Sequence, residues 1–320
     1  MKAAFYSENG GPEVLRYGDV AEPICGPEDV AIRVAAVSIE GGDLLHRRIT
    51  PVEGPYRVGG YQAAGIVTAV GADVQTVRPG DRVVGFNWSG SHAEVFVVPQ
   101  HFAYPVPEGI DLANVAPVPV AFGTAHHALF EYGGLKAGET VLIHGAAGGV
   151  GIALAQIAKW AGARVIGTAS SAEKIGRLKD LGLDHAIDGR ESDIRAEAMA
   201  LTAGSGVDLA IDLVGGPKFA EVAAVMRPRG RVVLVGFASG RQPVLDPAVI
   251  RQSGISVTGL MFGKVMHLPA IRSMISGLLE DVAAGTFVVP IETQFPLSEA
   301  AAAHRHAEQN RPFGRIVLIP

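Results

Sequence analysis

The sequence predicts a two-domain α/β protein in which a small β domain precedes a doubly wound parallel sheet. Within the first 116 residues, short β-branched runs are bounded by glycine and proline. Between 117 and 262, apolar strand-like runs alternate with helical patterns, which is typical of a parallel sheet covered on both faces. The length of 320 residues also exceeds what one hydrophobic core usually serves, so two domains are expected.

The composition limits the classes of function. With 48% hydrophobic and 18% charged residues, the chain resembles a well-buried globular enzyme. A formal net charge of −5 provides no basic surface for nucleic acid or an acidic membrane. The single cysteine, Cys25, excludes an intrachain disulfide and a multi-cysteine metal site. The N-terminus lacks the apolar run of a signal peptide, and no run approaches the ~18 apolar residues of a membrane helix. We therefore expect a soluble, cytoplasmic protein.

The two expected domains differ in the segments that connect their strands. In the first third, short strands are separated by turns such as Pro79-Gly80-Asp81, a pattern that predicts a small barrel-like domain. In the second part each strand is followed by a helix, and six strands make a complete dinucleotide-binding fold. The expected strands of the first third are 30–37, 64–70, 82–86 and 93–99, those of the second part are 141–144, 163–168, 185–187, 207–213, 231–236 and 255–260, and the intervening helices are 152–161, 173–181, 194–203 and 219–226.

After about residue 263 the alternation stops. A helical stretch over 268–284 and a helix over 298–309 precede a last strand over 314–319. Because no helix follows that strand, we expect it to return to the N-terminal β domain. The first domain is then discontinuous, comprising 1–116 and 263–320, with 117–262 inserted into it.

A glycine-rich loop over 145–151 identifies the second domain as a candidate dinucleotide-binding domain. It reads Gly-Ala-Ala-Gly-Gly-Val-Gly, so Ala146 stands where the usual fingerprint begins. Such loops also occur for packing alone, but this one follows a strand, opens a helix and comes first in the alternation, as the fingerprint requires. Backbone N–H groups at the helix start can then bind a pyrophosphate. The expected contacts are Ala147, Gly148, Gly149 and Val150.

The end of the second strand of this domain indicates which nucleotide binds. An NAD site places an acidic residue there to bind the ribose 2′-hydroxyl, about 20 residues after the loop. Ala169 stands at that position, which favours NADPH over NADH. Lys174 and Arg190 are cations that could bind a 2′-phosphate, although either one could instead be an ordinary solvated surface charge. The residues expected around the 2′-phosphate are Thr168, Ser170, Ser171, Lys174 and Arg190.

Several segments together resemble a known family. Met-Lys-Ala-Ala-Phe at 1–5, Gly-Gly-Pro-Glu-Val-Leu at 10–15, Arg-Pro-Gly-Asp-Arg-Val at 78–83 and the loop at 145–151 resemble the medium-chain dehydrogenase/reductase superfamily. The resemblance covers essentially the whole chain and is nearest to the zinc-free quinone oxidoreductase (zeta-crystallin-like) branch. It implies a GroES-like β-barrel substrate domain and a Rossmann NADPH-binding domain.

Departures from that family concern the metal and the substrate. The zinc-dependent members carry ligands in segments that read Ser-Ile-Glu-Gly-Gly-Asp at 38–43 and Gly-Tyr-Gln at 60–62 here. No metal is therefore expected, and without zinc the reduction of a quinone or an enone is favoured over alcohol oxidation. Similar quinone reductases often have Asn at position 40, Thr-Glu at 61–62 and Tyr at 189. Here Gly189 weakens the NADPH argument, and Glu40, Tyr61 and Gln62 leave the substrate contacts open.

The resemblance also suggests site residues. Tyr61, at the lost ligand position, is the candidate proton donor, and its alternative role is that of a packing aromatic. Glu40 and Asp43 are expected near the nicotinamide ribose, although Asp43 could instead cap a helix that begins at Leu44. The other expected cofactor contacts are Thr124, Val214, Val235, Gly236, Phe237, Met261 and Phe262 near the nicotinamide and Arg315 near the pyrophosphate. The scattered histidines His46, His92, His126 and His127 lack metal-ligand spacing and are expected to be structural or surface residues.

These inferences predict an NADPH-dependent, zinc-independent reductase that transfers hydride to a quinone or an α,β-unsaturated carbonyl. The edge strand over 255–260 makes a homodimer plausible, since exposed sheet edges invite a partner. One alternative is an enoyl-thioester reductase. Another is a non-catalytic NADPH-binding protein with a structural or regulatory role, because a fold can persist without its chemistry.

Overall fold

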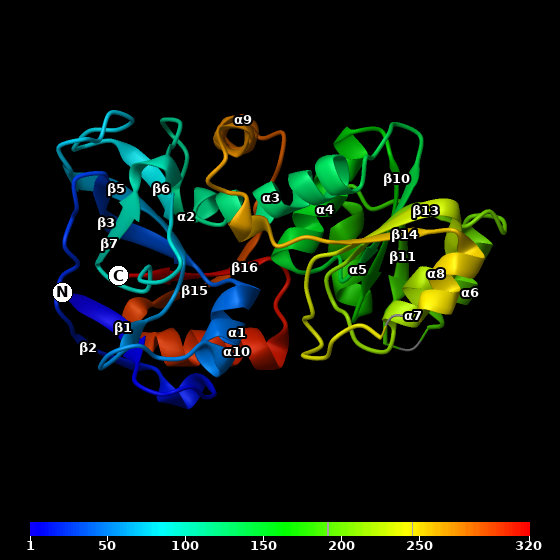
Figure 1. The fold of residues 1–320 in the computed structure, drawn as a ribbon, viewed down its shortest axis with the longest axis horizontal. Coiled ribbons are helices and arrows are strands. Elements are labelled where there is room, and N and C mark those ends of the chain that lie inside the picture. The colour runs from blue at the N-terminus through cyan, green and yellow to red at the C-terminus, as the bar shows by residue number, and fades with distance from the viewer. Residues whose placement is uncertain (191, 245) are drawn as a thin grey trace. The chain divides into compact units, whose positions relative to one another are not determined.

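The structure, a computed structural model, describes residues 1–190, 192–244 and 246–320. The chain divides into two compact units, one comprising Met1–Val120 with Lys264–Pro320 and the other Ala121–Gly263 (Figure 1). The first unit therefore contains both chain ends, and the second is a single continuous segment.

The first unit is built on a seven-stranded sheet with the order β15-β16-β3-β5-β6-β8, in which β7 also pairs with β3. All of its pairings are antiparallel except that of β15 with β16. A smaller antiparallel sheet has the order β2-β1-β4. The strands are β1 (Lys2–Tyr6), β2 (Arg16–Asp19), β3 (Asp29–Ser38), β4 (Arg57–Val58), β5 (Gln62–Val70), β6 (Arg82–Phe86), β7 (Val95–Pro99), β8 (Ala103–Pro105), β15 (Ile291–Pro296) and β16 (Arg315–Ile319).

The long strand β3 forms the centre of this unit. Its side chains Val30, Ile32 and Val34 point to one face and are buried in a core shared with residues of β5, β6 and β7. The final strand β16 pairs antiparallel with the end of β3, with Val317 opposite Ser38. The last segment of the chain thus completes a sheet that begins near the N-terminus.

Helices complete the first unit. They are α1 (Gly41–Ile49), α2 (Leu112–Val115), α9 (Pro269–Ala283) and α10 (Ala300–Asn310), together with the first residues of α3 (Val118–His127), which crosses the border between the units. Within the described residues, no helix is long and apolar enough to cross a membrane.

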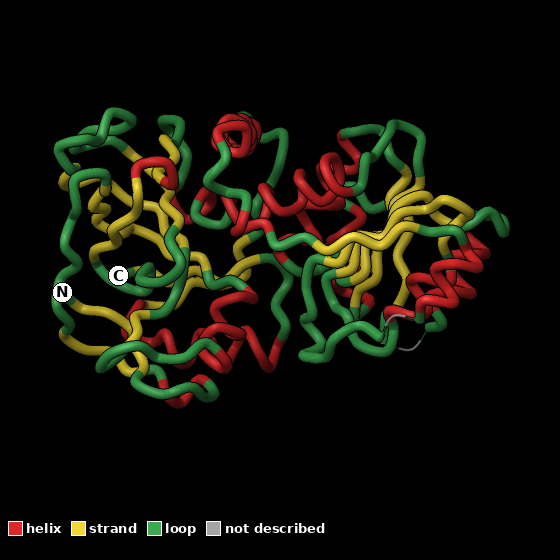
Figure 2. Tube along the Cα trace, in the orientation of Figure 1, coloured by secondary structure: helices red, strands yellow, loops and turns green. Residues whose placement is uncertain are grey.

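The second unit is a doubly wound Rossmann fold. Its six strands have the order β11-β10-β9-β12-β13-β14 and are all parallel, the 3-2-1-4-5-6 order of a dinucleotide-binding sheet. Figure 2 shows the strands of this unit side by side in yellow. The sequence prediction of this fold is confirmed. The strands are β9 (Thr140–His144), β10 (Arg164–Ala169), β11 (His185–Asp188), β12 (Val207–Asp212), β13 (Met226–Leu234) and β14 (Ser256–Gly259).

Helices of this unit lie on both faces of the sheet. Helices α6, α7 and α8 pack together on one face, over apolar side chains such as Leu142, Ile166 and Val232 (Figure 1). The connections through α4 and α5 run over the opposite face, where α4 contacts β9 and β10. The helices are α4 (Gly149–Trp160), α5 (Ala172–Lys179), α6 (Ile194–Leu201), α7 (Phe219–Ala224) and α8 (Pro247–Ser253).

Two predicted boundaries are wrong for identifiable reasons. Strand β13 begins at Met226 rather than at 231, because residues 227–230 bulge out between two paired stretches. Pro228 has no N–H to pair, and Arg229 adopts a left-handed φ of 65°. Helix α1 begins at Gly41 rather than at Leu44, because Asp43 lies inside its first turn and accepts a hydrogen bond from the backbone N–H of Glu40.

Replacing Ile143 with alanine tests the packing of the central strand. Ile143 lies in β9 and is 0% exposed, so Ile143→Ala should lower the free energy of unfolding by about 2–5 kcal/mol. Chemical unfolding followed by circular dichroism measures the change. The matched control is Ile24→Ala, since Ile24 is 90% exposed and its loss should leave the unfolding midpoint within error. An equal effect of both substitutions would contradict the assigned core.

Candidate functional site

The glycine-rich loop lies at the carboxyl edge of the parallel sheet, directly after β9. Strands β9 and β12 are neighbours there, and the chain order reverses between them, which is where doubly wound sheets bind their ligands. Gly145 has a φ of +95°, a value that favours glycine. The loop is held to β10, because Gly145 N donates to Thr168 Oγ1 at 3.0 Å and Ala146 N donates to the Thr168 carbonyl at 2.9 Å.

Two glycines of the loop have different roles. A Cβ on Gly151 would lie 2.4 Å from the Gly145 carbonyl oxygen, so Gly151 lets α4 pack against the loop. A Cβ on Gly148, by contrast, would meet nothing nearer than 3.9 Å. Gly148 is exposed and precedes the first turn of the twelve-residue helix α4. Its neighbourhood therefore leaves open space at a helix N-terminus, which suits the pyrophosphate of a dinucleotide.

The end of β10 carries no acidic residue, as the sequence indicates. Ala169 is buried there and pairs with Asp188 of β11, whose Oδ1 accepts from the backbone N–H of Arg190. Ser171 caps α5, since its Oγ accepts from the Lys174 N–H at 3.4 Å. Of the residues expected around a 2′-phosphate, Thr168 is buried and bonded to the loop. Ser170, Ser171 and Lys174 are half-buried beside it, and Arg190 is exposed.

A buried His–Asp pair lies beneath this edge and was not foreseen from the sequence. His144, the last residue of β9, bonds through Nδ1 to Asp212 Oδ1 at 2.8 Å. Asp212 ends the neighbouring strand β12 and also accepts from the N–H groups of Val214 and Gly215. Both side chains are buried. The pair fixes the turn that carries Val214, and polar residues at the ends of two adjacent strands are the signal that could have found it.

The remaining cofactor residues expected in the second unit follow its strand ends. Val214 comes after β12, and 235–237 come after β13. Beyond β14, Met261 is 64% exposed, whereas Phe262 is buried with its ring 5.6 Å from that of His127. Thr124 is buried in α3, the helix that also carries His127. All of these assignments stay predictions.

The structure brings together the three candidate residues of the first unit, Glu40, Tyr61 and Arg315, in one buried cluster. Glu40 Oε2 pairs with Arg315 Nη1 at 2.5 Å. Its other oxygen accepts from Ser38 Oγ at 2.7 Å and from Gln62 Nε2 at 2.5 Å. Burial raises the pKa of Glu40, and Arg315 and the two hydrogen bonds oppose that rise. Sequence reasoning named Glu40 and Arg315 separately but missed the ion pair that joins them.

Tyr61 lies beside this cluster as a protonated phenol. Burial, followed by the nearby carboxyl groups of Glu40 and Asp43, raises its pKa well above the ordinary value. Its ring lies 5.9 Å from the rings of both His46 and Phe86, and a Cβ on Gly42 would come within 2.7 Å of its hydroxyl oxygen. Tyr61 is therefore a phenol at neutral pH, with a hydroxyl proton that is available for a hydrogen bond.

Three buried polar atoms of the cluster have no hydrogen-bond partner among the described residues: Asp43 Oδ1, Arg315 Nε and Arg315 Nη2. Leaving a buried polar group unpaired costs about 1–3 kcal/mol. Asp43 offers an acceptor for a hydroxyl, and Arg315 offers donors for an anion. Burial raises the pKa of Asp43 well above the ordinary value, and the nearby Glu40 carboxyl adds to that rise. The cluster therefore holds hydrogen-bonding capacity that the described residues leave unused.

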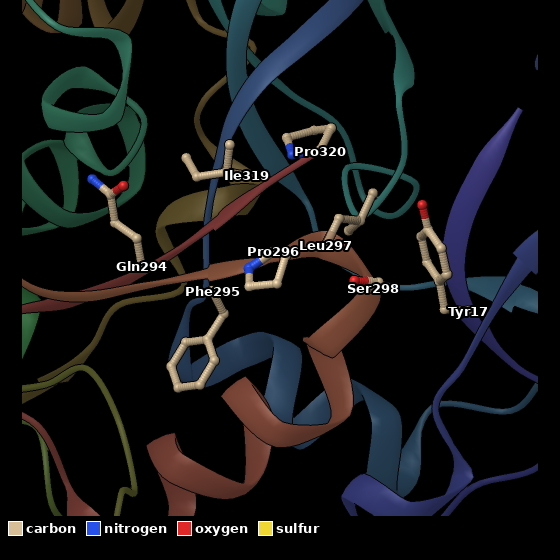
Figure 3. Close-up of a pocket in the computed structure, with 8 residues that line it drawn as sticks. All are labelled: Tyr17, Gln294, Phe295, Pro296, Leu297, Ser298, Ile319 and Pro320. Atoms are coloured by element: carbon tan, nitrogen blue, oxygen red, sulfur yellow. The ribbon is translucent and has the colours of Figure 1, made fainter.

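Cavities elsewhere in the first unit do not involve these residues. A cavity of about 370 Å³ lies where β15 and β16 end (Figure 3). A neighbouring one of about 280 Å³ includes Arg82 and Asp111. Neither contains a residue of the candidate site. Among the described residues, no group of three or more His, Cys, Asp or Glu side chains could hold a metal ion.

Comparisons with known proteins agree with this architecture. A family model described as an alcohol dehydrogenase GroES-like domain matches residues 26–108, and one described as a zinc-binding dehydrogenase matches residues 149–280. A quinone oxidoreductase of Pseudomonas aeruginosa is 32% identical over 98% of both chains. A 2-haloacrylate reductase of a Burkholderia species is 32% identical and covers 100% of this chain and 99% of its own.

Solved structures extend the likeness to three dimensions. The Escherichia coli quinone oxidoreductase complexed with NADPH has a TM-score of 0.94 at 27% identity, with 100% of both chains covered. The sequence-based resemblance is therefore confirmed, and the fold consists of a GroES-like domain and a Rossmann domain. With both domain models matched and a relative 32% identical along nearly its whole length, this chain belongs to the medium-chain dehydrogenase/reductase superfamily, in its quinone oxidoreductase branch.

Proposed function

We propose that the protein is an NADPH-dependent, zinc-independent reductase of quinones or α,β-unsaturated carbonyl compounds. The observation that carries the proposal is the open glycine loop at the point where the strand order reverses, followed by a strand end without an acid at Ala169. The related E. coli structure holds NADPH, and the two relatives described above are named for a quinone and a haloacrylate. In this reading the first unit is the GroES-like substrate domain and the second binds the cofactor.

The residues of the second unit bind and orient NADPH, which supplies the hydride when bound. Backbone N–H groups of 147–150 bind the pyrophosphate at the start of α4, and the His144–Asp212 pair holds the adjacent turn. Ser170, Ser171, Lys174 and Arg190 bind the 2′-phosphate, where no carboxylate ends β10 to repel it. The nicotinamide end is lined by Thr124, Val214, Val235, Gly236, Phe237, Met261 and Phe262.

The first unit supplies the polar groups around the reacting carbonyl. Glu40 holds Arg315 by a buried ion pair, so that the two unpaired nitrogens of Arg315 can bind phosphate oxygens. Asp43 Oδ1 accepts a hydrogen bond from a ribose hydroxyl. Tyr61 donates its phenolic proton to the oxygen or carbon that becomes negative after hydride transfer. Ser38, Glu40 and Tyr61 occupy the segments where zinc-dependent members carry ligands, which supports a reaction without metal.

The assembly is part of the same proposal. Strand β14 is the edge of the six-stranded sheet, so a second copy could extend the sheet there as a homodimer. The single cysteine suits a reducing compartment such as the cytoplasm. Sedimentation of the purified protein at micromolar concentration separates a dimer from a monomer.

The function itself is tested by steady-state kinetics with NADPH and with NADH against benzoquinone, naphthoquinone, alkenals and an enoyl thioester. We expect turnover of a quinone or an alkenal, a preference for NADPH, and activity that survives a chelator. Preference for the thioester would support the alternative enoyl reductase. Tight NADPH binding with no turnover of any acceptor would refute the proposed reductase activity.

Replacing Lys174 with alanine tests the 2′-phosphate site. Loss of one charged hydrogen bond should raise the KM for NADPH about tenfold and leave that for NADH unchanged. The matched control is Lys179→Ala, since Lys179 lies at the exposed end of the same helix. Equal KM values for NADPH in Lys174→Ala and the unaltered protein would remove Lys174 from the site.

Replacing each of the two loop glycines separates phosphate binding from packing. Gly148→Ala should weaken NADPH binding at least tenfold while lowering the unfolding free energy by less than about 1 kcal/mol, because its Cβ meets no neighbour within 3.4 Å. Gly151→Ala should instead destabilise the fold, because its Cβ would overlap the Gly145 carbonyl. Isothermal titration and thermal unfolding measure the two effects. Unchanged NADPH affinity in Gly148→Ala would contradict the assignment of the glycine-rich loop as the pyrophosphate site.

Replacing Tyr61 with phenylalanine tests the proton donor. Removal of a general acid should lower kcat about 10²-fold and leave NADPH affinity nearly unchanged. Tyr17→Phe, at an exposed tyrosine of the same unit, provides the control. An unaltered kcat in Tyr61→Phe would assign the proton to another donor or to water.

A further inference from the structure

A buried chain of polar side chains in the first unit lies outside the proposed reaction and has no role yet. Arg47 of α1 bonds through Nη1 to His304 Nδ1 of α10 at 2.5 Å. His304 Nε2 contacts His92 Nε2 at 2.9 Å, and His92 Nδ1 lies 3.5 Å from Ser91 Oγ. Arg47 and His304 are each 1% exposed, and His92 is fully buried. Arg47 also pairs with Glu308 of α10 and donates to the Gly10 carbonyl.

The chemistry of arginine fixes the direction of this chain. A guanidinium has donors only, so His304 Nδ1 must be the acceptor. In a neutral imidazole the proton of His304 then sits on Nε2 and is donated to Nε2 of His92. His92 in turn carries its own proton on Nδ1, facing Ser91. One tautomer of each ring is compatible with the contacts, so both histidines act as oriented dipoles.

Both rings are held neutral. Burial is the main cause that lowers the pKa of His92 to about 3, and the charge of Arg47 adds to it. Burial, His92 and Arg47 lower the pKa of His304 well below its ordinary value. The ionisable groups that face the two rings are Arg47 on α1, each other, and, across Arg47, Glu308 on α10. At neutral pH each of the two imidazoles therefore carries one ring proton, on the nitrogen assigned above.

One end of the chain supports the backbone that carries Tyr61. The N–H groups of His92 and Ser91 donate to the carbonyls of Gly59 and Gly60, at 2.9 and 3.2 Å. Gly60 has a φ of +78°, and a Cβ there would lie 1.9 Å from His92 Nδ1, so the imidazole fits directly against the residue before Tyr61. The sequence analysis expected His92 to be a structural or surface histidine, and it is a buried structural one.

The other end of the chain holds the helix that faces the Tyr61 hydroxyl. Arg47 lies on α1, whose first turn carries Gly42 against Tyr61 and the buried Asp43. The chain Arg47–His304–His92 therefore links the helix on one side of Tyr61 to the turn on the other. Glu308 pairs with Arg47 and so ties α1 to α10, a helix from the C-terminal part of the protein.

We propose that Arg47, His304 and His92 are positioning residues: their hydrogen-bonded side chains tie α1 to the imidazole that packs against Gly60, and so hold the Tyr61 hydroxyl in place. This inference rests on the proposed role of Tyr61 as proton donor. The three side chains act through the backbone of Gly60 and through α1, not by contact with substrate. Their loss should therefore lower kcat and change the environment of Tyr61.

The tautomers are tested first, because they do not depend on activity. In ¹⁵N-histidine-labelled protein, two-bond proton–nitrogen spectra should show His304 protonated on Nε2 and His92 on Nδ1. The signals are assigned by their loss in His304→Gln and His92→Gln. A proton on Nδ1 of His304, or an imidazolium at either residue near pH 7, would overturn the assigned chain.

The positioning role is tested with His304→Leu, which removes both links at similar volume. We expect kcat to fall at least tenfold, by a larger factor than any rise in the Kd for NADPH that displacement of Asp43 causes, and His304→Gln, which keeps one donor toward His92, to restore part of the loss in kcat. The control is His306→Leu on the same helix, since His306 does not contact the chain. If His304→Leu does not fold, His92→Gln breaks the same chain at its other end.

A readout at Tyr61 separates this inference from the proposed function. With ¹³C at Cζ of tyrosine, the neutral-pH chemical shift of Tyr61 should move in His304→Leu and stay in place in His306→Leu. That shift would support positioning even if Tyr61→Phe left kcat intact, an outcome that would refute only the donor role. An unmoved Tyr61 signal with an unchanged kcat in His304→Leu would overturn the positioning role alone.

Acid stability provides a further prediction. Because the folded protein lowers the pKa of both histidines, the unfolded chain binds more protons below about pH 6.5. The unfolding free energy should thus be constant above that value and decrease as the pH falls from about 6.5 toward 3. In His304→Leu this slope should become shallower over the same window. Urea unfolding at several pH values measures it, and an equal slope in both proteins would contradict the buried neutral pair.

Discussion

The ion pair between Glu40 and Arg315 is the constraint on which the proposed site depends. It joins the start of α1 to the start of β16, two segments from opposite ends of the chain. A buried pair of this kind is seldom a large source of stability, because desolvation offsets the attraction, but breaking it leaves a costly uncompensated charge. The pair therefore fixes geometry: with Glu40 bonded to Ser38, Gln62 and Arg315, α1 and the ends of three strands meet in one arrangement.

The buried polar groups of the first unit fall into two classes, those with a hydrogen-bond partner and those without one among the described residues. The Arg47–His304–His92 chain and the oxygens of Glu40 have their partners inside the protein. Asp43 Oδ1 and two nitrogens of Arg315 lack partners among the described residues, although both side chains are buried. The paired groups connect the elements of the scaffold, and the unpaired ones are those that we propose for ligand binding. The same division holds in the second unit, where the Asp212 carboxylate is bonded within the protein and Gly148 leaves open space.

Much of the architecture could be predicted from local patterns. The six parallel strands, the loop between β9 and α4 and the absence of an acid at Ala169 all follow from residues close together in sequence. The predicted start of β13 was wrong because Pro228 and Arg229 interrupt the strand pattern. The predicted start of α1 was wrong because the Asp43 side chain accepts a hydrogen bond from the backbone N–H of Glu40, three residues earlier. The Glu40–Arg315 pair could not be predicted, because nothing local in a glutamate specifies a partner on a distant strand, whereas the His144–Asp212 pair was missed although both residues end strands that the sequence predicts.

The sequence by itself determined the fold class and the dinucleotide loop, because hydrophobic periodicity and glycine spacing act over a few residues. It also determined which side chains are available at positions 40, 61 and 315. The tertiary structure alone decided that these three form one buried cluster and that the pKa of Tyr61 is raised there. The reason is physical: burial and the approach of two carboxyl groups raise the pKa of Tyr61, and both arise only when strands and helices from distant parts of the chain pack together.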